Sequence, residues 1–182
     1  MLDKFVDKVE EQRSVYFTGK INILLASSKQ LKAQIYLIEG EIVNVRYSGI
    51  EGIKAFYNLC FNLHQSDIFI VEPELVSLDK VKIKSNFGSL IKTYLNLEEQ
   101  FKEAESKRPP KNLKVLINSD LITQDTNIDS DEYELLCSMS DYNLVEDIYK
   151  YCKMLDYQIT NSLVSLRKKK AIKVIKFTKD GK

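Results

Sequence analysis

The stretch 35–60, IYLIEGEIVNVRYSGIEGIKAFYNLC, decides the fold. Its two apolar runs are separated only by Glu39-Gly40-Glu41, and Gly40 supplies the positive φ angle that a tight reversal needs. The pair therefore predicts a β-hairpin. After a turn at Tyr47-Ser48-Gly49 the apolar spacing changes from two residues to three or four, which predicts a helix from Ile50 to Leu63.

The flanking segments complete a predicted N-terminal domain, residues 1–84. An amphipathic pattern predicts a helix over the first dozen residues, and β-forming residues predict strands within 16–26 and at 68–71, before Pro73. We expect an α+β fold in which a small antiparallel sheet packs on helices.

A helical pattern over 85–107 ends at Arg108-Pro109-Pro110, because proline has no N–H to donate and disfavours helix in the preceding residue. We therefore assign 85–110 to a linker helix with a Pro-Pro break, and 111–182 to a second domain.

The second domain is predicted to hold a strand near 113–117, three short helices and a closing strand over 171–177. The first helix opens with Asp129 or Ser130 as its N-cap. Its expected buried stripe is Tyr133, Leu136, Cys137 and Met139. Three short helices and a terminal strand are the outline of a winged helix-turn-helix.

Composition narrows the class of protein. No apolar stretch approaches the roughly 20 residues of a membrane span, and the charged N-terminus does not look like a secretory signal. The three cysteines are widely spaced, and a single histidine, His64, leaves no credible zinc set. We expect a cytoplasmic protein whose thiols are reduced and at least partly buried, with no metal or cofactor.

Catalytic patterns are also missing from the sequence, which contains no GxGxxG, Walker, HExxH or nucleophile-elbow motif. His64 could act as a base or a pH switch, but a solvated loop histidine is the simpler interpretation. Glu39 and Glu41 flank a turn and are expected to be solvated, since paired-carboxylate hydrolysis needs two acids facing each other across a cleft. We expect no enzyme activity.

Charge is distributed unevenly along the second domain. Nine acidic and no basic residues lie between Asp120 and Tyr149, whereas ten basic residues and two acidic ones follow from Lys150 onward. This asymmetry is typical either of a charged partner surface or of two solvated faces that attract each other within one domain.

Four motifs of the first domain together resemble the PATAN family of bacterial signalling proteins: TGKINILLASS, IYLIEGEIVNV, GIEGIKAFYNL and SDIFIVEPE. The resemblance covers roughly Val15 to Glu74. The chain departs from it at Arg46 and Tyr47, where a small residue is common, and at Phe61-Asn62-Leu63, where a tryptophan is replaced.

The resemblance implies a non-catalytic adaptor, often linked to two-component receiver domains, surface motility or type IV pili, and sometimes followed by a winged-helix-like tail. We therefore consider a receiver domain, a motor ATPase or a small GTPase as the protein partner. The predicted contact residues are Arg46, Tyr47 and Ile50 at the hairpin–helix junction, and Tyr142 and Asp147 on the acidic helices.

A transcription regulator is the alternative. It would use the end of the third helix to contact DNA, because basic residues there are placed to meet phosphates. That face lacks the arginines that make most specific guanine contacts, and the acidic helices before it would repel DNA. The residues of this alternative are Asn161, Ser165, Arg167, Lys168 and Lys169.

Overall fold

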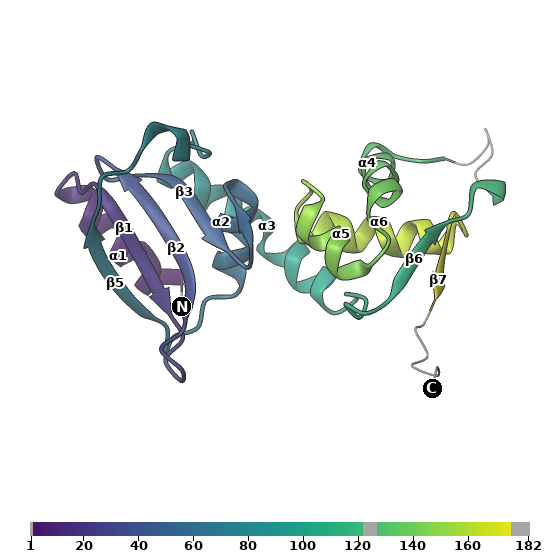
Figure 1. Ribbon diagram of the computed structural model, residues 1–182, viewed down its shortest axis with the longest axis horizontal. Helices are drawn as coiled ribbons and strands as arrows, with labels where there is room; N and C mark the ends of the chain where they lie inside the picture. The colour runs from purple at the N-terminus through teal and green to yellow at the C-terminus, as the bar shows by residue number, and fades with distance from the viewer. Residues whose placement is uncertain (1, 122–126, 176–182) are drawn as a thin grey trace. The chain divides into compact units, whose positions relative to one another are not determined.

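The computed structural model describes residues 2–121 and 127–175 (Figure 1). Contacts between Cα atoms divide the chain into two units, Met1–Glu98 and Glu99–Lys182. The division falls within a helix, before Arg108-Pro109-Pro110. The described residues form an α+β fold with six α-helices, a five-stranded antiparallel sheet and a separate pair of strands.

The N-terminal unit is built around the five-stranded sheet, whose strand order is β4-β3-β2-β1-β5, with every neighbouring pair antiparallel. Its elements are α1 (Leu2–Ser14), β1 (Gly19–Leu24), β2 (Leu31–Ile38), β3 (Glu41–Tyr47), β4 (Ile50–Glu51), α2 (Ile53–Phe61), β5 (Ile68–Pro73), the 3-10 turn η1 (Leu78–Lys80) and α3 (Phe87–Glu105).

The predicted hairpin, N-terminal helix and flanking strands are confirmed. The predicted start of the second helix at Ile50 is wrong. Ile50 pairs with Tyr47 in the two-residue strand β4, and α2 begins only at Ile53, after Gly52 with its φ of 82°. Ile50 therefore pairs with β3 across a tight turn, although the spacing of the apolar residues predicts a helix there.

The hairpin tip packs against the end of α1. Gly40 has a φ of 82°, and a Cβ atom added there would lie 2.7 Å from the Cα atom of Arg13. The backbone N–H of Gly40 donates to the carbonyl oxygen of Phe17 at 2.8 Å. Arg13 pairs with Glu41 at 2.8 Å, which fastens the tip to the first helix, while the Glu41 side chain stays 46% exposed, so the expectation of a solvated Glu41 is confirmed.

Four phenylalanines join the helices to one face of the sheet. The ring of Phe5 on α1 lies 6.1–6.4 Å, between centroids, from the rings of Phe56, Phe69 and Phe87, which belong to α2, β5 and α3. In Figure 1, α1 is seen behind β1 and β2, in agreement with these contacts. Burying one such ring contributes roughly 2 kcal/mol, so this cluster holds the helical layer on the sheet.

A bulge between β1 and β2 buries an ion pair. Ile23 faces Ala33 but Leu24 faces Leu31, which leaves Lys32 without an opposite residue. The Lys32 ammonium pairs with Asp67 at 2.5 Å, and the two side chains are 7% and 1% exposed. The carboxylate of Asp67 also accepts the backbone N–H of His64 at 2.8 Å, and the His64 side chain is exposed in this turn, as expected.

The C-terminal unit contains β6 (Lys114–Ile117), the 3-10 turn η2 (Ser119–Leu121), α4 (Ser130–Asp141), α5 (Val145–Tyr151), α6 (Asp156–Lys168) and β7 (Ile172–Ile175). The strand β7 pairs antiparallel with β6, which precedes all three helices. Within the described residues no hairpin follows α6. Residues 176 and 177 of the predicted closing strand lie outside the described part of the chain.

The predicted buried stripe of α4 is confirmed in part. Met139 is buried and Leu136 is partly buried against the core, as expected, whereas Tyr133 is 66% exposed and Cys137 is also exposed. Leu135 and Glu132 are buried instead. Glu132 is buried because it serves as the N3 residue of a capping box with Asp129 and because a lysine reaches it from α6. The hydrophobic pattern alone could not indicate a buried glutamate.

Candidate functional site

The face of the sheet opposite the phenylalanine cluster carries a chain of hydrogen-bonded polar side chains. Gln34 Nε2 donates to Asn22 Oδ1 at 3.0 Å, and the Tyr36 hydroxyl donates to Gln34 Oε1 at 3.2 Å. Arg46 Nη1 donates to the Tyr36 hydroxyl at 3.4 Å, and Arg46 Nε donates to Glu51 at 2.7 Å. The chain thus runs across β1, β2, β3 and β4; we call it the polar ladder.

Glu51 is the end of the polar ladder and its main acceptor. Lys82 pairs with it at 2.7 Å, and Asn44 Nδ2 lies 3.4 Å from its carboxylate. The hydrogen bond from Lys82, followed by that from Asn44 and by the charge of Arg46, holds the pKa of Glu51 below its usual value despite partial burial. Asn44 is fully buried and its Oδ1 accepts the backbone N–H of Gly52 at 3.0 Å, so the ladder is fixed to the start of α2.

The ring of Tyr36 is covered by cations. The Arg46 guanidinium lies 5.5 Å and the Lys80 ammonium 4.8 Å from the ring centroid, so Tyr36 is only 3% exposed on this face. Such contacts contribute about 0.5–1 kcal/mol each when exposed. The arginine is therefore oriented by a ring, a hydroxyl and a carboxylate at once.

A groove of about 500 Å³ lies at the end of the polar ladder, and three of the predicted contact residues line it. Arg46, Tyr47 and Ile50 come together there because β3 turns into β4 at Ser48-Gly49, two residues with φ angles of 51° and 79°. Leu31, 54% exposed, and Glu51 line the same groove. Sequence reasoning missed both, because the two-residue strand β4 and the bulge beside Leu31 are not visible in the alternation of apolar residues.

The other two predicted contact residues lie in the C-terminal unit. The ring of Tyr142 stacks on that of Tyr151 with 4.8 Å between centroids and 20° between planes. Asp147 is half-buried on α5. The two residues therefore lie in a different unit from the groove.

The residues of the nucleic-acid alternative, which lie along α6 and at its C-cap, divide into two groups. Asn161, Arg167 and Lys168 are exposed, and within the described residues neither basic side chain forms an ion pair. Lys169, in contrast, pairs with Glu132 at 2.6 Å, and Glu132 is 1% exposed.

Glu132 collects several donors. Burial by itself would raise the pKa of Glu132, but hydrogen bonds from Lys169, from Ser165 and from the backbone of Asp129 outweigh it and leave the pKa below its usual value. Two of the five residues assigned to DNA, Ser165 and Lys169, thus interact with a buried carboxylate.

A second, apolar pocket of about 250 Å³ lies in the C-terminal unit, between the Pro-Pro segment, the paired strands and α6. Its walls include Pro109, Leu163 and Val174, and Arg167 and Arg108 lie at it. Arg108 is bound to Asp156 at 3.0 Å and stacks over Tyr149 at 4.2 Å, so its position is fixed by the fold.

Titratable groups in the described residues do not gather into a metal centre: no three histidine, cysteine, aspartate or glutamate side chains there are placed to share an ion. Burial raises the pKa of the Cys60 thiol, which keeps it protonated. The described helices all lack the combination of length and apolar character that crossing a membrane requires.

Comparison with known proteins yields no match of any kind, whether to a family model, to a curated protein or to a solved structure.

Proposed function

We propose that the chain is a non-catalytic regulatory adaptor that binds a protein partner at the groove where β3 turns into β4, beside the polar ladder, with Arg46, Tyr47 and Ile50 at the contact. The polar ladder is the observation that carries this proposal. Its side chains are held by one another before any partner arrives, and a preorganised surface loses less entropy on binding than a mobile one.

The groove beside the ladder adds apolar area to this polar surface. Leu31, which is 54% exposed, and Ile50 line this groove. Arginine and tyrosine next to exposed aliphatic side chains are the composition that protein interfaces favour. Arg46, whose side chain is 46% exposed, remains accessible although it is held by Glu51.

The resemblance of residues 15–74 to the PATAN family supports a partner from bacterial signalling. We propose a PATAN-like module in a two-component or motility pathway, with a receiver domain, a motor ATPase or a small GTPase as partner. The C-terminal unit is then a winged-helix-like accessory module.

The test is a pull-down from the native cell lysate with the immobilised full chain, its Arg46→Glu variant and a Lys92→Ala control, which changes an exposed cation on α3. We expect a protein of one of the three named classes to be captured by the wild type and the control and lost with Arg46→Glu. Equal capture by all three chains, or capture of none of these classes, would contradict the proposal.

DNA binding is the second candidate, favoured by Arg167 and Lys168, which are exposed at the end of α6, and by Asn161, which is exposed in the middle of the same helix. A gel-shift titration at two salt concentrations tests it, because affinity that rests on phosphate contacts falls steeply with salt. Absence of a shift at low salt ends this alternative.

A further inference from the structure

The strand β5 ends the sheet formed by the described residues, and one of its sides has no neighbouring strand. Its six residues pair with β1 in unbroken register, from Ile68 opposite Leu24 to Pro73 opposite Gly19. An edge strand presents unpaired N–H and C=O groups, which are a template for another extended chain.

Pro73 shows which groups face that edge. Proline has no N–H to give to a ladder, so within a sheet it is tolerated where its nitrogen points away from the neighbouring strand. Backbone groups alternate in direction along an antiparallel strand. The N–H and C=O groups of Phe69 and Val71 therefore face the free edge too. The carbonyl of Asp67 points to the same side as those of Phe69 and Val71, and it accepts a hydrogen bond from the Lys4 ammonium of α1 at 2.8 Å.

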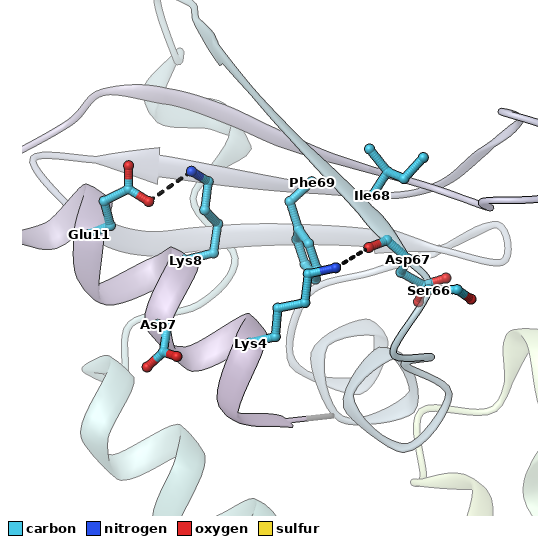
Figure 2. A pocket seen from close by; sticks show the side chains of 8 residues that line it. All are labelled: Lys4, Asp7, Lys8, Glu11, Ser66, Asp67, Ile68 and Phe69. Atoms are coloured by element: carbon cyan, nitrogen blue, oxygen red, sulfur yellow. Dashed lines mark hydrogen bonds and ion pairs between the residues drawn. The ribbon is translucent and has the colours of Figure 1, made fainter.

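A groove of about 570 Å³ runs between this edge and α1, and Figure 2 shows its lining. The helix contributes four charged side chains in the order plus, minus, plus, minus: Lys4, Asp7, Lys8 and Glu11. Lys4 donates to backbone carbonyls at the start of β5, and Lys8 pairs with Glu11 at 2.7 Å.

The helix α1 runs alongside β5 in the same direction. Phe5 packs on Phe69, whereas Arg13 lies against Gly40, at the end of the sheet that also holds Pro73. The midpoint of the four charges lies between Asp7 and Lys8. Along the axis of α1 it is about 4 Å closer to the C-terminal end than Phe5, at the helical rise of 1.5 Å per residue. A strand covers that distance in about one residue, which places the midpoint level with Ile70.

We propose that the chain forms a two-fold symmetric dimer in which β5 pairs antiparallel with β5 of a second copy, about an axis at Ile70. In this register Phe69 is opposite Val71 of the second copy, and both have their backbone groups directed at each other. Ile70, 40% exposed on the outer face, meets Ile70 of the second copy. The result is one continuous ten-stranded sheet.

The charges of α1 match under the same operation. A two-fold axis between Asp7 and Lys8 brings Lys4 opposite Glu11 of the second copy and Asp7 opposite Lys8 of the second copy. Every facing pair then has opposite signs. The edge and the helix are thus both self-complementary about one axis, which is what an interface between identical copies requires and what favours a second copy over an unrelated peptide.

Sedimentation velocity of the full chain over a range of concentrations tests the dimer, and a charge series locates it. Asp7→Lys sets two lysines opposite each other at two symmetric places, so we expect the dissociation constant to rise about fivefold or more, as weak exposed pairs allow. The double variant Asp7→Lys, Lys8→Asp restores opposite signs and is expected to recover dimerisation. Asp79→Lys makes the same charge change on the exposed turn η1 and is expected to have no effect.

Val71→Pro tests the strand pairing. The N–H of Val71 faces the free edge, so a proline there keeps the hydrogen bonds between β5 and β1 but removes a hydrogen bond to β5 of the second copy. We expect this variant to be a monomer with an unchanged circular dichroism spectrum. If this variant does not fold, the charge series still decides. A chain that is monomeric at every concentration, or a dimer that is insensitive to the charge series, would overturn the proposal.

Discussion

Each unit of the molecule holds a glutamate with a lysine, and the two pairs serve different ends. Glu51 and Lys82 lie 2.7 Å apart on the outer face of the sheet, with side chains 30% and 50% exposed. Glu132 and Lys169 lie 2.6 Å apart, but the glutamate is 1% exposed. Water can replace a lost partner at the exposed Glu51 but not at the buried Glu132. The Glu51–Lys82 pair therefore orients surface side chains, whereas the Glu132–Lys169 pair stabilises the core of its unit.

The largest difference between the two pairs is expected in stability. Glu132→Ala removes the buried carboxylate, the capping box and the partner of Lys169, and we expect a loss of about 3 kcal/mol in the free energy of unfolding. Urea unfolding of the full chain measures it. Glu134→Ala, at an exposed position of the same helix, is the control and should cost less than about 0.5 kcal/mol.

Two neighbouring lysines of α6 and its C-cap sharpen the comparison. Lys169→Gln leaves Glu132 buried without its cation, and we expect it to destabilise the protein by about 2 kcal/mol, less than a fully buried pair because Lys169 is 30% exposed. Lys168→Gln changes an exposed side chain and should cost less than about 0.5 kcal/mol. Thermal unfolding of both variants measures the difference; equal effects would show that the pair with Glu132 contributes little.

Acid should remove the contribution of the Glu132–Lys169 pair to stability. The pKa of Glu132 is below its usual 4.5 in the folded protein, so its contribution to stability is complete above about pH 4.5 and disappears as the pH falls through the lower folded value. Unfolding free energies of the wild type and of Glu132→Gln, measured from neutral pH downward, should converge in that acidic range. A constant difference between the two curves would contradict the assignment.

The smallest expected change in stability is at the polar ladder. Arg46→Ala removes an exposed ion pair and a cation–π contact, so we expect the free energy of unfolding to fall by no more than about 1 kcal/mol. Its effect on capture of the protein partner should be far larger. Thermal unfolding and the pull-down are to be measured on the same preparation, and a large loss of stability would show that the ladder is part of the core.

Local patterns sufficed for much of the N-terminal unit. The reversal at Gly40 and the alternation on either side of it predict β2 and β3, because a tight turn and its strands depend on neighbours in sequence. The groove residues Arg46, Tyr47 and Ile50 were predicted together for the same reason: one turn separates them.

Contacts between distant residues could not be predicted in this way. Lys82 pairs with Glu51 at the end of the polar ladder from a loop that crosses back to the sheet, and Gln34 bonds to Asn22 because of the register of β1 and β2. Glu132 is buried because Lys169, 37 positions later, compensates its charge. A hydrophobic pattern treats such a glutamate as solvent-exposed, which shifted the predicted stripe of α4 to Tyr133 and Cys137.

The buried pair of Lys32 and Asp67 has a consequence for how the sheet assembles. If β2 moved by one residue along β1, the Lys32 ammonium would move away from the Asp67 carboxylate. Both charges would then be buried without a partner, at a cost of several kcal/mol. Misaligned versions of the hairpin are therefore penalised far more heavily than side-chain alternation alone would require. The bulge and its buried ion pair therefore help to specify a single alignment of β2 on β1.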